Sequence, residues 1–288
     1  MILTRNAFAK INLRLEIKSA RPDGYHEIDT DMSLITLADK ITLEISGGEH
    51  THIAAVYKSG KITVPGESFA GDLVSKAAQM YVKASGITRI HSDFEIVKNI
   101  PVGAGLGGGS SDAASALLML NEAYNHTLSR ESMMALAGEI GADVPFFVSG
   151  FNNAHCTGIG EIVAEIPEKY SSVSVVVVKP DRSNITAEMY REYDKFKDKI
   201  PRIQDENIAN SFALIPSELN SEVINPIKAA LIKSGAFAAE MSGSGSAVFG
   251  LFCDASEAEK CAESVKSTLT GIEFCGVYEI VNRVNRNE

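Results

Sequence analysis

The chain has 288 residues, of which 45% are hydrophobic and 22% are charged. This composition is typical of a globular protein and excludes a disordered, collagen-like or low-complexity chain. Lys and Arg number 27 against 37 Asp and Glu, a formal net charge of −10, which argues against sequence-independent binding to nucleic acid because such binding depends on basic contacts to phosphates.

The cysteine and histidine content predicts neither a metal site nor a disulfide framework. The four cysteines form no Cys-x-x-Cys pair, so we expect reduced thiols in a cytoplasmic protein. The segment His50-x-His52 is expected in an exposed loop, and no histidines have a metal-ligand spacing. The N-terminus lacks a signal-peptide core, and the longest apolar run, residues 175–178, is too short to span a membrane. We therefore expect no membrane partner.

The N-terminal part is predicted to be mostly extended. Residues 9–18 alternate between apolar and polar side chains, which predicts a half-buried strand with Lys10 on its polar face. A turn signal at residues 21–24 and two further extended segments, 32–37 and 41–45, predict an antiparallel meander.

Helices and strands are mixed in both halves of the remaining chain. One helix is expected to start directly after the richest glycine cluster, capped by Ser110 or Ser111. A second helix, 129–140, is expected to be capped by Ser129 and to end at Gly141. The other predicted elements are a helix at 70–85, a strand at 94–97, a strand at 173–178, helices near 186–198 and 222–234, a loop and strand at 241–252, a helix at 255–269 and a strand at 274–281. This mixture favours an α+β fold over a doubly wound sheet, and the stretch rich in Gly and Asn at 150–160 suggests two domains, 1–152 and 153–288.

The strongest local signal is the glycine-rich loop at residues 103–111. Its five glycines within seven residues allow positive φ and close approach to a ligand, and the following helix N-terminus favours phosphate. A flexible surface loop is the alternative. The loop formally contains Gly-x-Gly-x-x-Gly, but a helix follows where a dinucleotide-binding fold needs a second strand. No Walker motif or protein-kinase catalytic signature is present.

Lys10 and Asp143 are the candidates for phosphoryl-transfer chemistry. A carboxylate that accepts a hydroxyl proton and a cation that stabilises developing charge are what such a transfer needs. Asp143 lies between a helix end and the apolar run at 144–148, where a carboxylate needs a partner. The alternatives are a solvated strand edge for Lys10 and a helix-terminating turn for Asp143.

Two further segments suggest ligand contacts. Tyr25 and His26 offer an aromatic face beside a donor and acceptor ring, which is typical of binding to a planar base, although packing within a hairpin is an alternative. The second glycine-rich loop, at 241–246, allows close backbone approach to a ligand or forms a plain turn.

Taken together, these segments resemble the GHMP small-molecule kinases. The phosphate loop of that superfamily, Pro-x-x-x-Gly-Leu-Gly-x-x-Ser-Ser, stands here at residues 101–111. More narrowly, the blocks AKINL at 9–13, PDGYH at 22–26 and GADVPF at 141–146 are similar to the 4-diphosphocytidyl-2-C-methyl-D-erythritol kinase family. The resemblance extends over essentially the whole chain, in one order.

The resemblance implies a ribosomal-S5-like N-terminal domain and a ferredoxin-like C-terminal domain, with the ligands in the cleft between them. It implies an enzyme that uses ATP, with Mg²⁺ delivered by the nucleotide, to phosphorylate the 2-hydroxyl of a small-molecule substrate, 4-diphosphocytidyl-2-C-methyl-D-erythritol, in non-mevalonate isoprenoid biosynthesis. We expect a monomer or weak homodimer.

The resemblance also assigns residues to roles. Asp143 would be the base that activates the hydroxyl, and Lys10 would keep that carboxylate ionised and stabilise the transferred phosphoryl group. The residues expected to bind the ATP phosphates are Pro101, Gly103, Gly105, Leu106, Gly107, Gly108, Gly109, Ser110 and Ser111.

On the substrate side, the resemblance implies that Asn12 orients the acceptor, His26 binds the cytosine edge, Tyr25 stacks on the ring and Tyr190 covers its other face. Two departures qualify this assignment. Met32 stands where an aromatic residue is expected, and residues 181–225 match the family poorly. The open alternatives are a GHMP-type kinase that acts on a different small alcohol and a catalytically silent ligand-binding member of the superfamily.

Overall fold

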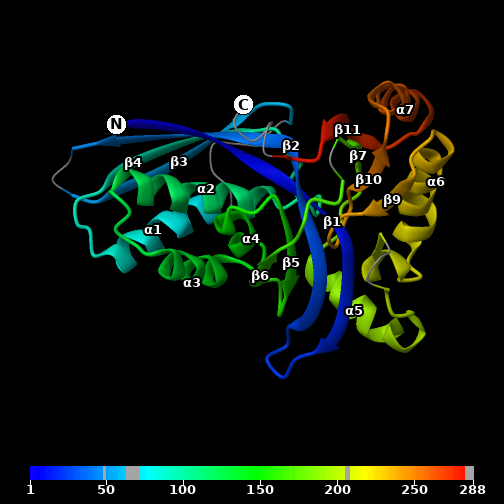
Figure 1. The fold of residues 1–288 in the computed structure, drawn as a ribbon, viewed down its shortest axis with the longest axis horizontal. Coiled ribbons are helices and arrows are strands. Elements are labelled where there is room, and N and C mark those ends of the chain that lie inside the picture. The colour runs from blue at the N-terminus through cyan, green and yellow to red at the C-terminus, as the bar shows by residue number, and fades with distance from the viewer. Residues whose placement is uncertain (48–49, 63–71, 171, 205–207, 283–288) are drawn as a thin grey trace.

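A computed structural model describes residues 1–47, 50–62, 72–170, 172–204 and 208–282. Two β-sheets lie next to each other, each with helices packed against it (Figure 1). The predicted α+β class is confirmed. None of the helices in the described part of the chain is long and apolar enough to cross a membrane.

The elements follow one another along the chain in a mixed order. They are β1 (Ile2–Ala20), β2 (His26–Ser46), β3 (His52–Ser59), α1 (Leu73–Ser85), β4 (His91–Lys98), α2 (Gly108–Ala123), α3 (Arg130–Ile140), α4 (Val144–Ser149), β5 (Asn153–Thr157), β6 (Ile162–Glu165), β7 (Ser174–Pro180), α5 (Thr186–Phe196), η1 (Lys197–Lys199), β8 (Ala209–Asn210), η2 (Ser211–Leu214), the π-helical η3 (Asn220–Ile224), α6 (Asn225–Lys233), β9 (Ala238–Met241), β10 (Val248–Phe252), α7 (Ala255–Thr268) and β11 (Ile272–Glu279).

The first sheet has the strand order β3-β4-β2-β1-β8, and β5 and β6 continue it from β2. Helices α1 to α4 lie together on one side of it (Figure 1). Their apolar side chains, including Leu117 and Phe146, form one core with Leu43 and Phe94 of the sheet. Packing in this core fixes the positions of α2 and α4, whose N-terminal ends face the candidate site.

The second sheet has the order β11-β7-β10-β9, with antiparallel pairing throughout. Helices α6 and α7 pack on it with apolar residues such as Leu231 and Val265. The pairing brings β9 and β10 together, so the second glycine-rich loop connects two adjacent strands.

The two sheets meet along β1. Ile11 and Leu13 of β1 pack with Val175 and Phe249 of the second sheet, while the alternate side chains, beginning with Lys10, are buried on the opposite side. The prediction of a half-buried strand is therefore wrong, because the polar face is buried as well, Lys10 against the glycine-rich loops and Asp143, and Arg14 against Asp29.

Several local predictions are corrected by pairing that is distant in sequence. The segments 32–37 and 41–45 belong to one strand, β2, and the unpredicted β3 runs parallel to β4, so there is no simple meander. Residue Gly107, in a left-handed conformation, is the N-cap of α2, and no described side chain caps that helix. Ser110 and Ser111 lie inside its first turns. Of the predicted helix 70–85, positions 70 and 71 lie outside the described residues.

Other predictions are confirmed. Ser129 accepts a hydrogen bond from the backbone N–H of Ser132 and caps α3, which ends at Gly141. The hairpin of β5 and β6 pairs with β2 through Cys156 and Thr30, so strands on both sides of the predicted boundary at 152/153 share the first sheet. The division into 1–152 and 153–288 stays a prediction.

Candidate active site

Lys10 lies at the centre of the site. Its backbone N–H donates to the carbonyl of Leu106 in the first glycine-rich loop at 2.9 Å, and its Nζ lies 3.5 Å from Asp143 Oδ2 and donates to Asn12 Oδ1. The Lys10 side chain is only 3% exposed, which excludes the solvated strand edge that the sequence left open. Strand β1 thus places an ammonium group against the two glycine-rich loops and the start of α4.

Asp143 is held at the start of α4, next to that ammonium group. It occupies the N-cap position, yet its side chain makes no capping hydrogen bond, and it is 29% exposed. A residue that merely began this helix would cap it, since Asp is a preferred N-cap. Its carboxylate therefore faces Lys10 and remains open to a ligand, an arrangement suited to accept a proton from a hydroxyl group.

The two glycine-rich loops pack directly against each other. Gly103, Gly105 and Gly107 all have positive φ, as the glycine content predicts. At Gly105 a Cβ would lie 2.0 Å from the carbonyl oxygen of Ser242, so the close approach there is to the second loop. Ser242 Oγ donates to the Gly105 carbonyl at 2.9 Å, and the backbone N–H of Ala247 donates to Ala104 at 3.0 Å. These contacts exclude a flexible surface loop and a plain turn.

A cavity of about 360 Å³ lies along the first glycine-rich loop and the N-terminus of α2. The uncapped N–H groups of this helix favour an anion there. The predicted phosphate-binding residues that line it are Pro101, Gly103, Gly105, Leu106, Gly107, Gly108, Gly109 and Ser110. Ser111 does not line this cavity and is buried within α2.

A buried charge cluster supports that loop and was not predicted. Lys98 Nζ donates to Asp39 and to Asp112 Oδ2, the latter at 2.6 Å, and Asp39 Oδ1 accepts from the N–H of Ile100 at 2.8 Å. Burial and, to a smaller extent, Asp39 raise the pKa of Asp112 to about 8 against the opposing effect of Lys98. The signal was present in β4, because the alternation that buries Phe94 and Ile96 places Lys98 on the same face.

The Asp112 carboxylate also has an unused oxygen. Its Oδ1 is buried and accepts no hydrogen bond from the residues the structure describes, although Asp112 lines the cavity along the glycine-rich loop. An unpaired buried carboxylate oxygen is costly unless a further partner binds it. This atom is therefore available to a cation that enters with a phosphate ligand.

A larger cavity, of about 670 Å³, also borders the first glycine-rich loop. It contains every residue predicted to be catalytic or to bind substrate, namely Lys10, Asn12, Tyr25, His26, Asp143 and Tyr190. Gly103, Gly105, Gly107 and Ser110 line both cavities, so the two cavities adjoin at this loop. Met32 lies at the larger cavity and is fully buried.

The far end of the larger cavity is aromatic. The His26 ring stacks on Tyr190 with 4.6 Å between ring centroids and 17° between planes, and His26 Nε2 lies 3.0 Å from Asp194 Oδ1. Tyr25 is 60% exposed at the rim. Burial raises the pKa of Tyr190 to about 12, which keeps its hydroxyl neutral. Asp194 had no sequence signal, because it meets His26 only through the packing of α5 against the start of β2.

The segment 181–225, which matches the family poorly, is part of this site. The side-chain amide of Asn184 donates to the Ser244 carbonyl, and that of Asn210 donates to the carbonyls of Met241 and Gly243, each at 2.7 Å. The segment therefore fixes the second glycine-rich loop. Glu206 and Asn207, two of its divergent positions, lie outside the described residues.

Comparison with known proteins agrees with this architecture. Residues 72–151 match the model of the GHMP kinases N terminal domain, and residues 191–271 match that of the GHMP kinases C terminal domain. A crystal structure of mevalonate kinase from L. major superposes with a TM-score of 0.69 at 15% identity, covering 98% of this chain and 96% of that one, which shows the shared fold. The fold and the site define an ATP-dependent small-molecule kinase of the GHMP class.

Proteins with higher sequence identity to this chain identify its family within the GHMP kinases. The 4-diphosphocytidyl-2-C-methyl-D-erythritol kinase of Geotalea daltonii is 38% identical over 89% of this chain and 92% of its own length, and that of Geobacter metallireducens is 38% identical over 92% and 95%. A crystal structure of 4-(cytidine 5'-diphospho)-2C-methyl-D-erythritol kinase superposes with a TM-score of 0.77 at 30% identity, covering 96% of this chain and 99% of that one. The chain belongs to the 4-diphosphocytidyl-2-C-methyl-D-erythritol kinase family.

Proposed function

We propose that this enzyme transfers the γ-phosphoryl group of ATP to the 2-hydroxyl of 4-diphosphocytidyl-2-C-methyl-D-erythritol in non-mevalonate isoprenoid biosynthesis. The observation that carries the proposal is that two cavities adjoin at the first glycine-rich loop, with Lys10 and Asp143 lining the larger one. A phosphate donor in one cavity and an alcohol in the other would meet where the two cavities adjoin. The names of the relatives support the assignment of 4-diphosphocytidyl-2-C-methyl-D-erythritol as the acceptor.

Residues of the site and the two ligands account for every bond and proton in the transfer. Asp143 accepts the proton of the 2-hydroxyl, the oxygen forms a bond to the γ-phosphorus, and the bond from that phosphorus to the β–γ bridging oxygen breaks to release ADP. Lys10 compensates the charge that develops on the phosphoryl oxygens. Asn12, whose Oδ1 accepts from Lys10 and whose Nδ2 donates to Thr30 Oγ1 at 2.8 Å, keeps the ammonium group in position and lies beside the acceptor.

The aromatic end of the larger cavity suits the cytidine group. With Asp194 accepting from the Nε2–H of His26, the Nδ1 atom of that ring is left to accept a hydrogen bond from an exocyclic amine. Tyr190 and Tyr25 supply ring faces on which a pyrimidine can stack. Because Tyr190 already packs on His26, the base would bind beside this stack or displace one ring of it.

The residues along the phosphate cavity also suit Mg²⁺, which prefers oxygen ligands and bound phosphates. Asp112 Oδ1, buried without a hydrogen-bond partner among the described residues, and the Ser110 hydroxyl would hold the ion. When bound, Mg²⁺ neutralises phosphate charge.

We further propose that the enzyme is cytoplasmic and acts as a monomer or weak homodimer, in keeping with its acidic charge and unpaired cysteines.

The test is ADP release with Mg-ATP and the cytidine-linked acceptor. Asp143→Asn should lower kcat by on the order of 10²–10⁴-fold, the range for loss of a general base, while ATP still binds. Asp198→Asn, which alters an exposed carboxylate in η1, is the matched control and should keep normal turnover. Near-normal turnover in Asp143→Asn would contradict the mechanism.

The same assay distinguishes the cytidine-linked acceptor from a different small alcohol. Met32 and the divergent segment 181–225 both contribute to the larger cavity, and they favour, as a second candidate, a kinase for a different small alcohol. If methylerythritol derivatives that lack the cytidine group are phosphorylated as efficiently as the full acceptor, the cytidine-linked substrate is wrong and the GHMP-type kinase activity stands.

A further inference from the structure

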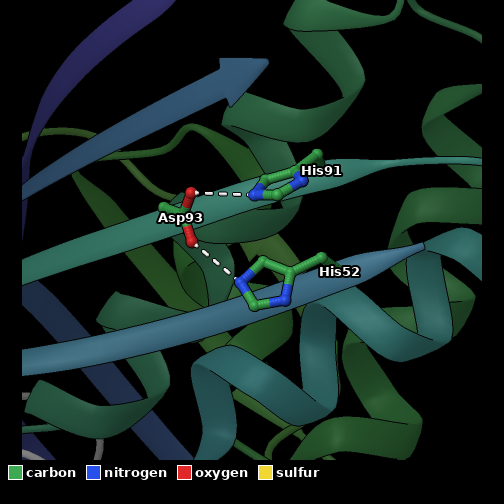
Figure 2. A group of neighbouring side chains, drawn as sticks. All are labelled: His52, His91 and Asp93. Atoms are coloured by element: carbon green, nitrogen blue, oxygen red, sulfur yellow. Dashed lines mark hydrogen bonds and ion pairs between the residues drawn. The ribbon is translucent and has the colours of Figure 1, made fainter. Parts of the chain in front are cut away.

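A cluster of two histidines and one aspartate lies on the first sheet, on strands β3 and β4, and β2 separates these strands from β1, which holds Lys10. His52 begins β3, the edge strand, and His91 begins the parallel neighbour β4, where the two residues are directly paired. Asp93 stands two residues after His91, so its side chain projects from the same face of β4. Figure 2 shows both imidazole rings directed at the Asp93 carboxylate.

The geometry is close to that of a metal centre. His52 Nε2 lies 3.1 Å from Asp93 Oδ1 and His91 Nε2 lies 3.4 Å from Asp93 Oδ2, and one ligand atom from each residue lies within 4.8 Å of the others. Metal–ligand bonds of about 2.0–2.2 Å at tetrahedral angles separate ligand atoms by about 3.4 Å. Each histidine nitrogen already lies at about this separation from one of the two Asp93 oxygens, and rotation of the side chains, which are 32–50% exposed, would bring one ligand atom of each residue around a single ion.

The chemistry of the donors selects the metal. Two imidazole nitrogens and one carboxylate oxygen suit Zn²⁺ and its transition-metal neighbours, whereas Mg²⁺ prefers oxygen ligands alone. Lys58, the cation farther along β3 on the same face, is paired with Glu95 at 2.5 Å, so its charge is offset. Parallel pairing preorganises the two histidines, because the backbone hydrogen bonds of both strands fix their spacing.

We propose that His52, His91 and Asp93 form a surface site for Zn²⁺, with solvent completing the coordination. The ion would link the start of the edge strand β3 to β4. Spacing along the chain gave no hint of this site, because His52 and Asp93 are 41 positions apart and meet only through the pairing of β3 with β4. The expectation that His52 lies in a loop is wrong for the same reason.

The experiment is calorimetric titration of the full-length protein, free of any tag, with Zn²⁺. One equivalent should bind with a dissociation constant in the micromolar range, and Mg²⁺ should not compete. His52→Gln and His91→Gln should each weaken binding by at least about tenfold, since loss of even an outer-shell partner costs that much. His126→Asn, which removes an exposed histidine outside the cluster, is the matched control and should leave binding unchanged.

Zinc should also raise the melting temperature of the wild type. At a free zinc concentration about 100-fold above the dissociation constant, the expected rise is about 4 °C for a chain of this size, and it should vanish in both glutamine variants. Far-UV circular dichroism of each variant shows that the fold is retained, independently of kinase activity. The proposal is overturned if Zn²⁺ does not bind, if the glutamine variants bind it as tightly as the wild type, or if Cys253→Ser, which removes the exposed thiol, abolishes binding.

Discussion

The contact between the two glycine-rich loops makes Gly105 the most sensitive position in the site. Gly105 has φ of +75°, and a Cβ there would lie 2.0 Å from the Ser242 carbonyl oxygen and 3.1 Å from the N atom of Gly245. Both neighbours are backbone atoms, which cannot rotate away as a side chain does. Substitution by Ala must therefore separate the loops and break the hydrogen bonds that join Ser242 to Gly105 and Ala247 to Ala104.

The size of the effect follows from these terms. Positive φ costs an alanine about 1–2 kcal/mol, and two neutral hydrogen bonds contribute about 1 kcal/mol each, a total of about 3–4 kcal/mol. Since the loop lines both cavities, most of this should appear as lost transition-state stabilisation. At about 1.4 kcal/mol per factor of ten, kcat/KM for ADP release should fall by on the order of 10²–10³-fold in Gly105→Ala.

Gly103→Ala is the matched control for that prediction. Gly103 also has positive φ, at +64°, but no atom of the residues that the structure describes lies within 4 Å of its Cβ position, so only the conformational cost applies. Its kcat/KM should fall by about tenfold, from about 1–2 kcal/mol. Equal losses in the two variants would refute the reasoning, because backbone strain alone would then explain both.

Two other predictions concern the groups that support these loops. Asn210→Ala removes both amide hydrogen bonds to the second loop and should lower kcat/KM by tenfold or more, whereas Asn220→Ala, which loses two equivalent bonds to the carbonyls of Phe212 and Ile215 but none to a glycine-rich loop, should lower stability without that kinetic loss. Burial raises the pKa of Asp112 to about 8, far above its value in an unfolded chain, so its contribution to stability is full at low pH and is lost as the pH rises toward 8. The free energy of unfolding in urea should therefore decrease from pH 5 to pH 8, by at most about 1.4 kcal/mol per pH unit from this group, and Asp112→Asn should flatten that dependence. An unchanged slope in the variant would show that other groups cause it.

Much of the site could be predicted because its chemistry is concentrated in short segments. Glycines that need positive φ and a helix N-terminus after them are visible locally, and Lys10 and Asp143 are each recognisable in their own segment, although only the family resemblance implied that they meet. The environment of these groups was harder to predict. Lys10 stands on the polar side of an alternating strand, a pattern that normally means solvent, and only the meeting of the two sheets with the loops buries it.

Groups that meet through strand pairing escaped prediction altogether. Lys98 with Asp39, and His52 with Asp93, come together because β4 lies between β2 and β3. Nothing in either local sequence specifies that neighbour, since the parallel pairing of β3 with β4 depends on a long connection rather than a tight turn. The cap of α2 was missed for a related reason, because Gly107 satisfies the loop geometry and leaves the N–H groups uncapped.

The poor match of residues 181–225 to the family has a physical explanation that also bears on substrate specificity. Asn184 and Asn210 act on the second glycine-rich loop by donating to backbone carbonyls, and any side chain with a correctly placed N–H can do this. Such a role constrains position more than residue identity, so a divergent sequence can preserve the loop. Tyr190 and Asp194, by contrast, present side chains to His26 within the larger cavity. Changes of substrate should therefore follow changes at these two positions rather than the overall divergence of the segment.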